Sequence, residues 1–234
     1  MSEFEGNVAV VTGASSGIGR ATAELLARRG ARVVVFARSA AKLRELATPF
    51  GDQMAVVAGD VSKLEDVERL FSTAESRFGS CDILVNNAGM IDPAPLVETT
   101  FEEWREMFAV NVDSIFLTCR RALPSMLDRG SGSIVNVSSI SGVPGPEKFH
   151  GWVSYCASKG AVISLTEALA VEIHPSQVRV NCVSPGSVDT PMWAEASGGA
   201  PADMTAAEVA ETILFLASSR SRPMNGQNLH VYSS

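Results

Sequence analysis

Two residues in the stretch SYCASKGAV could carry acid–base chemistry together. Tyr155 and Lys159 are four residues apart, so on a helix their side chains share one face, one turn from each other. A free tyrosine titrates near pH ~10 and transfers protons poorly at neutral pH unless a fixed positive charge stabilises its phenolate. The ammonium of Lys159 could supply that charge. Because this spacing also occurs by chance on exposed helices, its meaning depends on the rest of the chain.

Apolar runs of strand type alternate with segments of helical periodicity along the whole chain. The predicted strands cover residues 7–11, 32–36, 54–58, 83–85, 133–137, 178–183 and 228–232. The predicted helices cover residues 18–29, 63–78, 101–129, 155–173 and 206–218. This order predicts a doubly wound α/β fold with a seven-stranded parallel sheet flanked by helices on both faces.

The composition bounds the domain organisation, the partners and the location. The chain of 234 residues has a net charge of −7 and no basic run, which argues against nucleic acid as a partner. No apolar run approaches the ~18 to 20 residues of a membrane span, and the acidic start MSEFEG is unlike the basic start of a secretory signal. We therefore expect a single cytoplasmic domain over residues 1–234, without a membrane partner.

The four cysteines stand singly among apolar neighbours, at Cys81, Cys119, Cys156 and Cys182. Their spacing fits neither a zinc site nor a disulfide framework, so we expect reduced core residues and no metal. Cys156 lies beside Tyr155 but lacks the local His or Asn signature of a nucleophilic cysteine.

A glycine-rich turn follows the first predicted strand. Residues 12–19 read TGASSGIG, and a predicted helix begins within this stretch. Glycines in such a turn let a pyrophosphate approach the backbone amides, and the helix start adds the positive end of its dipole. Gly30 then closes the helix as a C-terminal cap. The strand before the turn and the helix after it favour a dinucleotide site over a simple turn.

Several motifs in a fixed order resemble those of the short-chain dehydrogenase/reductase (SDR) family across nearly the whole chain. They are TGASSGIG at 12–19, NNAG at 86–89, Asn111, Ser138–Ser139, the pair Tyr155 and Lys159, and Pro185–Gly186. The resemblance implies a Rossmann-like fold and an oxidoreductase with a nicotinamide cofactor. The cofactor contacts that it implies are Gly13, Ser15, Ser16, Gly17, Ile18, Gly19, Arg38, Asp60, Val61, Asn87, Ala88, Gly89, Tyr155, Lys159, Pro185, Gly186, Val188 and Thr190.

The end of the second predicted strand bears on the choice of cofactor. A carboxylate there would bind the ribose hydroxyls of NAD, whereas an arginine would pair with the extra phosphate of NADP. Ala37 stands where NAD-type members of the family usually carry Asp, and Arg38 where many NADP-type members carry a base. We therefore predict NADP(H). NAD(H) stays open, because arginine can also stack on adenine.

The same resemblance implies four catalytic residues. Tyr155 would protonate a carbonyl oxygen as hydride arrives, or act as the base when an alcohol is oxidised. Lys159 would lower the pKa of Tyr155, helped by the oxidised nicotinamide, and hydrogen-bond the nicotinamide ribose. Ser139 would polarise the substrate oxygen, and Asn111 would support a water-linked proton path from Lys159. From the residue alone, Asn111 fits equally a polar residue that bends its helix and is satisfied locally.

The interval between Ser139 and Tyr155 is longer than is common in the family. Ser138, Ser139 and Ser141 are therefore all eligible as the substrate-polarising serine, and we choose Ser139 because it is the second serine after the strand. Ser141 is the runner-up and would line the substrate pocket.

Two loosely composed stretches, near residues 140–154 and 190–205, are candidate substrate loops because they follow strands at the ligand-binding edge. In the first, Phe149, His150 and Trp152 fit an apolar wall over a substrate, and equally packing against the protein or a partner subunit. The second is small and glycine-bearing, which predicts that it closes the site loosely or becomes ordered only with ligand.

The predicted function is an NADP(H)-dependent short-chain oxidoreductase that interconverts a carbonyl and an alcohol on a small molecule. The alternatives are an NAD(H)-dependent alcohol dehydrogenase of the same family and a non-catalytic dinucleotide sensor, although sensors often lose the tyrosine or lysine. The resemblance also implies a homodimer or homotetramer built through residues 101–129 and 155–173. The ending Tyr232-Ser233-Ser234 stands where an Asp-Gly-Gly tail is common, which puts one usual subunit interface in question.

Overall fold

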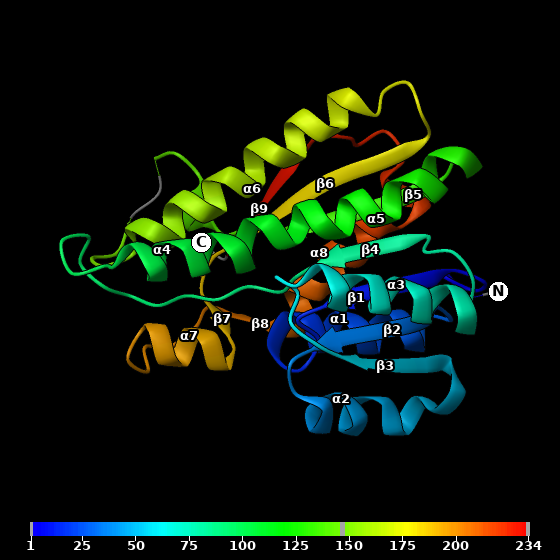
Figure 1. Cartoon of the computed structure of the whole chain (residues 1–234), viewed down its shortest axis with the longest axis horizontal. Helices are drawn as coiled ribbons and strands as arrows, with labels where there is room; N and C mark the ends of the chain where they lie inside the picture. Colours follow the sequence, from blue (N-terminus) through cyan, green and yellow to red (C-terminus); the bar gives the residue numbers. More distant parts are fainter. Residues whose placement is uncertain (1, 146–147, 233–234) are drawn as a thin grey trace.

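A parallel sheet forms the centre of the molecule (Figure 1). The computed structural model describes residues 2–145 and 148–232. In this part of the chain the sheet has seven parallel strands in the order β3-β2-β1-β4-β5-β6-β9. The strands are β1 (Val8–Thr12), β2 (Arg32–Ala37), β3 (Met54–Ala58), β4 (Ile83–Asn86), β5 (Gly132–Val137), β6 (Val178–Pro185) and β9 (Asn228–Val231). The predicted seven-stranded α/β fold is confirmed.

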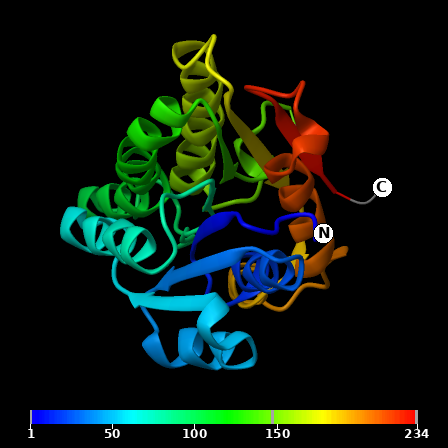
Figure 2. The ribbon, with the colours of Figure 1, turned by 90° about the vertical axis from the view of Figure 1, so that its right-hand side faces the viewer.

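Helices cover both faces of the sheet, and the turned view separates the two layers (Figure 2). One apolar core lies under α1 (Gly17–Arg28), α2 (Ala40–Ala47) and α8 (Ala206–Ala217). The other lies under α3 (Leu64–Arg77), α5 (Ser114–Arg129) and α6 (Val153–Glu172). Within the described residues, no helix is long and apolar enough to cross a membrane.

The predicted helix at 101–129 is divided into two α-helices. α4 (Phe101–Phe108) and α5 are joined by a π-helical turn over Ala109–Asp113, with Asn111 at its centre. Wider π-turns of this kind often occur at functional sites, because they turn one side chain out of the regular helical order. The single unbroken helix that periodicity predicts is therefore wrong at this turn.

A polar network crosses the apolar interior between the sheet and the helices α5 and α6. Asn86 on β4 donates to the side-chain oxygen of Asn136 on β5 at 2.9 Å and accepts from Thr118 on α5 at 2.8 Å. Asn136 donates in turn to the hydroxyl of Thr166 on α6 at 2.9 Å. These four side chains are buried, and their polar groups satisfy one another, so the network fixes both helices on the sheet.

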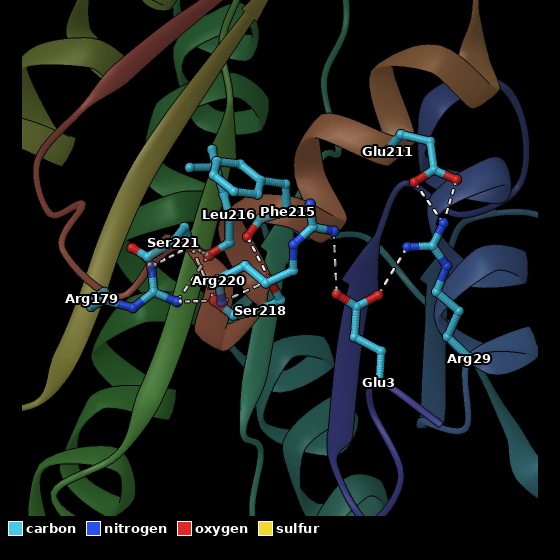
Figure 3. Close-up of polar contacts among 9 residues, drawn as sticks. All are labelled: Glu3, Arg29, Arg179, Glu211, Phe215, Leu216, Ser218, Arg220 and Ser221. Carbon is cyan, nitrogen blue, oxygen red and sulfur yellow. Dashed lines mark hydrogen bonds and ion pairs between the residues drawn. The ribbon is translucent and has the colours of Figure 1, made fainter. Parts of the chain in front are cut away.

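One partly buried arginine holds the C-terminal end of α8 (Figure 3). The guanidinium of Arg179 on β6 donates to the carbonyl oxygens of Leu216 and Ser218, each at 3.0 Å, and to the hydroxyl of Ser221 at 2.9 Å. These carbonyls lie at the negative end of the helix dipole, where a cation is stabilising. Arg179 thus joins β6 to α8.

Replacing this arginine is expected to destabilise the fold strongly. Arg179→Met keeps much of the aliphatic volume but removes the charged donor from these carbonyl oxygens and leaves them only neutral donors, such as the hydroxyls of Ser133 and Ser221. This should cost about 2 to 4 kcal/mol of unfolding free energy. Arg220→Met is the matched control, because Arg220 is exposed and lies 3.8 Å from Glu3 (Figure 3); it should cost less than about 1 kcal/mol. Urea unfolding curves measure both, and equal losses would contradict this role for Arg179.

Candidate active site

A large cleft opens at the carboxyl ends of the strands, with a volume of about 1670 Å³. It is lined by the loops that follow β1, β2, β3, β4, β5 and β6. All the predicted cofactor-binding residues line it except Gly19, and the predicted catalytic residues Ser139, Tyr155 and Lys159 line it as well. Asn111 does not reach the cleft surface. The structure therefore brings together in one cleft residues that the sequence spreads from Gly13 to Thr190.

The loops after β1 and β4 are bound directly to each other. The hydroxyl of Thr12 accepts hydrogen bonds from the backbone amides of Asn87 and Ala88, at 3.1 Å each. The Asn87 side chain donates back to the carbonyl oxygens of Thr12 and Gly13, at 3.1 and 3.2 Å. A Cβ added at Gly13 would lie 2.7 Å from the Ala88 Cα, and one at Gly19 would collide with the Asn87 side chain. Gly19 thus permits this packing without lining the cleft.

The start of α1 is open towards the cleft. Ser16 precedes the helix but its side chain does not cap it, and the first turn carries no acidic residue. The backbone amides of this turn, with the positive end of the dipole, therefore face the cleft without a side-chain acceptor from Ser16. Gly17 has φ +53°, and a Cβ there would lie 2.9 Å from the Thr190 methyl. This cradle fits the pyrophosphate of a dinucleotide.

Three basic residues surround the end of the cleft next to β2. Arg38 follows β2 directly, Lys42 lies on α2, and Lys63 precedes α3. All three are exposed, and none forms an ion pair with any residue that the structure describes. Lys42 and Lys63 were not predicted; the signal in the sequence for Lys42 was its position four residues after Arg38. The neighbouring Asp60 carboxylate accepts from the Ser62 amide and hydroxyl, at 2.9 and 2.8 Å.

Tyr155 and Lys159 lie on α6, as their spacing predicts, and both are almost fully buried, at 7% and 4% exposure. The Lys159 ammonium lies 5.7 Å from the centre of the Tyr155 ring and donates to the carbonyl oxygen of Val137 at 3.0 Å. A Cβ added at Gly89 would lie 3.4 Å from the Lys159 Nζ, so the glycine of NNAG leaves room for the ammonium.

Burial dominates the titration of this pair in the cofactor-free chain. Desolvation raises the pKa of Tyr155 from 10.0 to about 12, while the neighbouring Ser139 hydroxyl acts in the opposite direction. Desolvation also lowers the pKa of Lys159 from 10.5 to about 8. The lowering of the tyrosine pKa that the sequence led us to expect from Lys159 is therefore absent from this state. A further positive charge in the cleft would be needed to produce it.

The three candidate serines have different surroundings. Ser138 lines the cleft, but its hydroxyl proton is engaged with the protein, because it donates to the backbone carbonyl of Lys159 at 2.7 Å. Ser139 lies beside Tyr155, and its hydroxyl accepts from the Ser141 amide at 3.1 Å, which fixes its position at the start of a short helical turn. Ser141 is buried and lines the same cleft. The geometry thus favours Ser139 as the serine that shares a substrate oxygen with Tyr155.

Asn111 links three segments next to the site. Its side-chain oxygen accepts from the Met90 amide at 2.8 Å, and its side-chain nitrogen donates to the Met90 carbonyl and the Ser158 hydroxyl, both at 3.0 Å. A Cβ added at Gly89 would lie 3.3 Å from the Asn111 side-chain oxygen. Asn111 thus lies in a bent helix and close to Lys159, and its partners Met90 and Ser158 come from distant segments rather than from its own helix.

The predicted substrate loop at 190–205 contains regular elements that its composition does not indicate. Thr190 caps α7 (Pro191–Ala196) by accepting from the Trp193 amide at 3.2 Å. The loop is closed at its base by two short paired strands, β7 (Val188–Asp189) and β8 (Met204–Thr205). These elements depend on hydrogen bonds that composition does not reveal.

The loop near 140–154 supplies Phe149, His150 and Trp152 to the cleft lining. Pro146 and Glu147, within this loop, lie outside the described residues, as do Ser233 and Ser234 of the unusual tail. Tyr232 lines the cleft and lies against Gly186, where an added Cβ would be 3.0 Å from the tyrosine Cβ. Among the described residues, no cluster of three or more His, Cys, Asp or Glu side chains could hold a metal ion.

Comparison with known proteins shows similarity along the whole chain. The sequence profile of the family described as short chain dehydrogenase matches residues 7–200. An uncharacterized oxidoreductase of Staphylococcus saprophyticus is 39% identical over 219 residues, covering 92% of each chain. A cis-4-hydroxycyclohexanecarboxylate dehydrogenase of Sinomonas cyclohexanicum is 42% identical over 232 residues, covering 92% of this chain and 90% of that one. A solved short chain dehydrogenase/reductase family protein superposes with a TM-score of 0.90 at 37% identity, covering 98% and 97%.

The buried lysine is expected to give the cofactor-free protein a distinct pH dependence. Between about pH 8 and pH 10.5 the unfolded chain holds the Lys159 proton and the folded chain does not, so the contribution of Lys159 to the unfolding free energy should rise with pH in this window. The buried thiols of Cys81, Cys119 and Cys182, whose pKa is raised from 9.0 to about 12, act in the opposite direction above about pH 9, so the contribution of Lys159 is read from the difference between the wild type and its variant. Lys159→Met should lack this rise, whereas Lys42→Met, which removes an exposed lysine, should keep it. Denaturant unfolding at pH values across the window measures the difference. Parallel curves for the wild type and Lys159→Met would contradict the desolvation of this ammonium.

Proposed function

Because the chain belongs to the short-chain dehydrogenase family, whose members are NAD(P)-dependent oxidoreductases, we propose that it interconverts a carbonyl and an alcohol with NADP(H) as cofactor. The observation that carries the proposal is the placement of Ser139, Tyr155 and Lys159 in one cleft with the glycine-rich cradle of α1. The cradle accommodates a dinucleotide, and the three side chains supply a proton donor, an oxygen ligand and a buried cation.

In the reducing direction, a nicotinamide held in this cleft would supply the hydride for the carbonyl carbon. Tyr155 transfers its phenolic proton to the carbonyl oxygen, so the C=O bond becomes a CH–OH group and the tyrosine is left as a phenolate. Ser139 donates a hydrogen bond to the same oxygen and stabilises the charge that develops there. Lys159 stabilises the phenolate until a proton from solvent restores the phenol.

The electrostatics of the cofactor-free site fit an acid better than a base. With its pKa raised to about 12, Tyr155 holds its proton at neutral pH and is ready to donate it. To act as a base in alcohol oxidation it must first ionise, and this requires a positive charge in the cleft beyond that of Lys159. In alcohol oxidation the oxidised nicotinamide would supply that charge, whereas carbonyl reduction uses the phenol already present in the cofactor-free site.

The preference for NADP(H) is supported by the three free cations near β2. A 2′-phosphate carries about two negative charges near neutral pH, and Arg38 can bind it with a bidentate pair of hydrogen bonds. Lys42 and Lys63 add positive charge to the same end of the cleft. No carboxylate occupies position 37, where Ala37 is buried at the end of β2. The alternative, NAD(H) use with Arg38 stacked on adenine, would leave these lysines without a ligand charge.

Two observations bear on the type of substrate and on the alternative of a non-catalytic sensor. One relative is named as a dehydrogenase of cis-4-hydroxycyclohexanecarboxylate, which supports CH–OH and C=O chemistry on a small molecule here. A dinucleotide sensor would not need a tyrosine and a lysine buried together at a cleft, because burying an ammonium is costly unless it is used.

We include in the proposal a homodimer or homotetramer and a cytoplasmic location. Ile115 on α5 and Val162 on α6 are buried against the sheet, whereas Phe116 on α5 and Val171 on α6 are exposed by 53% and 77%. Exposed apolar side chains on these two helices support a subunit interface there. The four cysteines are free thiols, which fits a reducing compartment.

Arg38 is expected to set the cofactor preference. Arg38→Ala should weaken NADPH binding by about tenfold to a hundredfold and leave NADH binding nearly unchanged, because only NADPH carries the phosphate. Lys42→Ala should have a smaller effect in the same direction. Arg44→Ala is the control, since Arg44 lies on the same helix but does not line the cleft. Calorimetric titration of both cofactors tests this, and a wild type that binds NADH as tightly as NADPH would refute the preference.

The catalytic assignment is tested by three substitutions with NADPH and a panel of ketones and aldehydes. Tyr155→Phe should reduce kcat by about a thousandfold with cofactor affinity intact, because it removes only the proton donor. Ser139→Ala should reduce it by about a hundredfold, and Ser141→Ala by only a few-fold. If NADPH binds tightly but no compound is reduced by any variant or by the wild type, the sensor function is favoured instead.

A further inference from the structure

We propose that the substrate is an uncharged ketone whose carbonyl is attached to a ring, and that Phe149, Trp152 and Trp193 recognise that ring. This rests on the proposed function and specifies the substrate class of the same site. The three side chains come from the two substrate loops and line the cleft together with Tyr155. We call them the aromatic wall.

The aromatic wall is continuous and adjoins the proton donor. The rings of Phe149 and Trp152 have centroids 4.6 Å apart, and Trp193 lies edge-on to both, at 6.3 and 6.4 Å. Trp152 meets Tyr155 edge-on at 5.6 Å, with an interplanar angle of 83°. When the carbonyl oxygen of a substrate lies at Tyr155, a group attached to its carbonyl carbon can therefore lie against the aromatic wall. Rings gain more from such faces than open chains, because edge-to-face and offset-stacked pairs add to simple apolar burial.

The wall is preformed, since both loops that carry it are tied down. On one side, the Lys148 ammonium donates to the carbonyl oxygens of Ser141 and Val143, at 2.8 and 2.6 Å, next to Phe149 in sequence. On the other, the Trp193 indole donates to the Ala200 carbonyl at 2.9 Å, inside the loop closed by β7 and β8. A wall held in place before binding loses little conformational entropy when a rigid ring docks.

The charge of the two loops argues against an anionic substrate. Their charged or titratable contributions to the described cleft lining are His150, Glu195 and Asp203, with no lysine or arginine among them. Lys148 points at backbone carbonyls instead. Apart from Lys159 and the charged residues at the end of the cleft next to β2, the rest of the lining adds one cation, Arg105, and three acids, Asp92, Glu106 and Asp113. A carboxylate on the substrate ring would therefore enter a region where acids outnumber the cation, which disfavours it. The proposed substrate is accordingly a neutral molecule.

The first experiment compares ketones of equal carbon number with NADPH and the wild-type protein. Cyclohexyl methyl ketone and acetophenone carry a ring, and hexyl methyl ketone is the open-chain match. We expect kcat/KM for the two ring ketones to exceed that for the open chain by about tenfold or more. Acetylbenzoate, which adds a carboxylate to acetophenone, should be reduced at least about tenfold less efficiently than acetophenone. Equal kcat/KM values across the set would overturn the inference.

Variants of Trp193 test whether this side chain causes the preference for ring ketones over the open-chain ketone. Trp193→Leu should reduce the ratio of ring to open-chain kcat/KM to about 1. Trp193→Phe keeps an aromatic face but not the indole donor, so it should retain most of the ratio. If Trp193→Phe loses it as fully as Trp193→Leu, the hydrogen bond to Ala200 rather than the ring face is responsible, and recognition by the wall is refuted. Trp104→Leu is the control, because Trp104 stacks on Phe108 and does not line the cleft.

Phe149→Ala provides an independent measurement, since Phe149 is 44% exposed and its removal is not expected to unfold the protein. It should lower the same ratio by a few-fold. Failure of this inference and failure of the proposed function give different results. Turnover of all the ketones at one efficiency, abolished by Tyr155→Phe, would refute the ring preference alone. Absence of any turnover would refute the enzymatic function itself.

Discussion

The contact between the loops after β1 and β4 is the constraint on which the site depends. The Thr12 hydroxyl accepts hydrogen bonds from two backbone amides of the loop after β4. The Asn87 side chain donates two hydrogen bonds to backbone carbonyls at the end of β1 and in the loop after it. These bonds require the two backbones to approach closely, which only glycine permits at positions 13 and 19. The contact fixes both the open start of α1 and the course of Gly89, past which the Lys159 ammonium and the Asn111 amide oxygen lie. The glycine-rich turn and the proposed proton-transfer residues are thereby held in fixed positions relative to each other.

A second layer of order comes from polar groups placed inside the apolar interior. Asn86 and Asn136 would each be costly to bury alone, but together with Thr118 and Thr166 they satisfy one another. The network joins adjacent strands to α5 and α6. These hydrogen bonds compensate the cost of burying the two side-chain amides, and they also limit how far α6 can slide or rotate. Tyr155 and Lys159 lie on this helix, so their positions are limited too. Precise placement of the phenol thus begins in the core.

The sequence predicted what depends on local pattern and could not predict what depends on distant contacts. Apolar runs located all seven strands, and the spacing of Tyr155 and Lys159 placed them on one helix. The π-turn at Asn111 was missed because its partners, Met90 and Ser158, are far away in the chain. Trp193 was missed as a wall residue for the same reason. In the cofactor-free chain burial raises the pKa of Tyr155, an effect that spacing could not predict because it shows the neighbouring charge but not the depth of burial.

The small sheet of β7 and β8 separates the loop at 190–203 from the rest of the fold. It brings the two ends of the loop together, and the Ser187 side chain reinforces the closure by bonding to both the carboxylate and the amide of Asp203. The contacts at the two ends of the loop therefore compensate the entropic cost of closing it. That cost grows only slowly with the number of residues in the loop. Beyond Thr190, which packs against Gly17, residues 191–203 can differ in type and number while the glycine-rich turn and the buried tyrosine stay in place. The part of the proposed substrate site that this loop forms can therefore vary without a change in the rest of the fold.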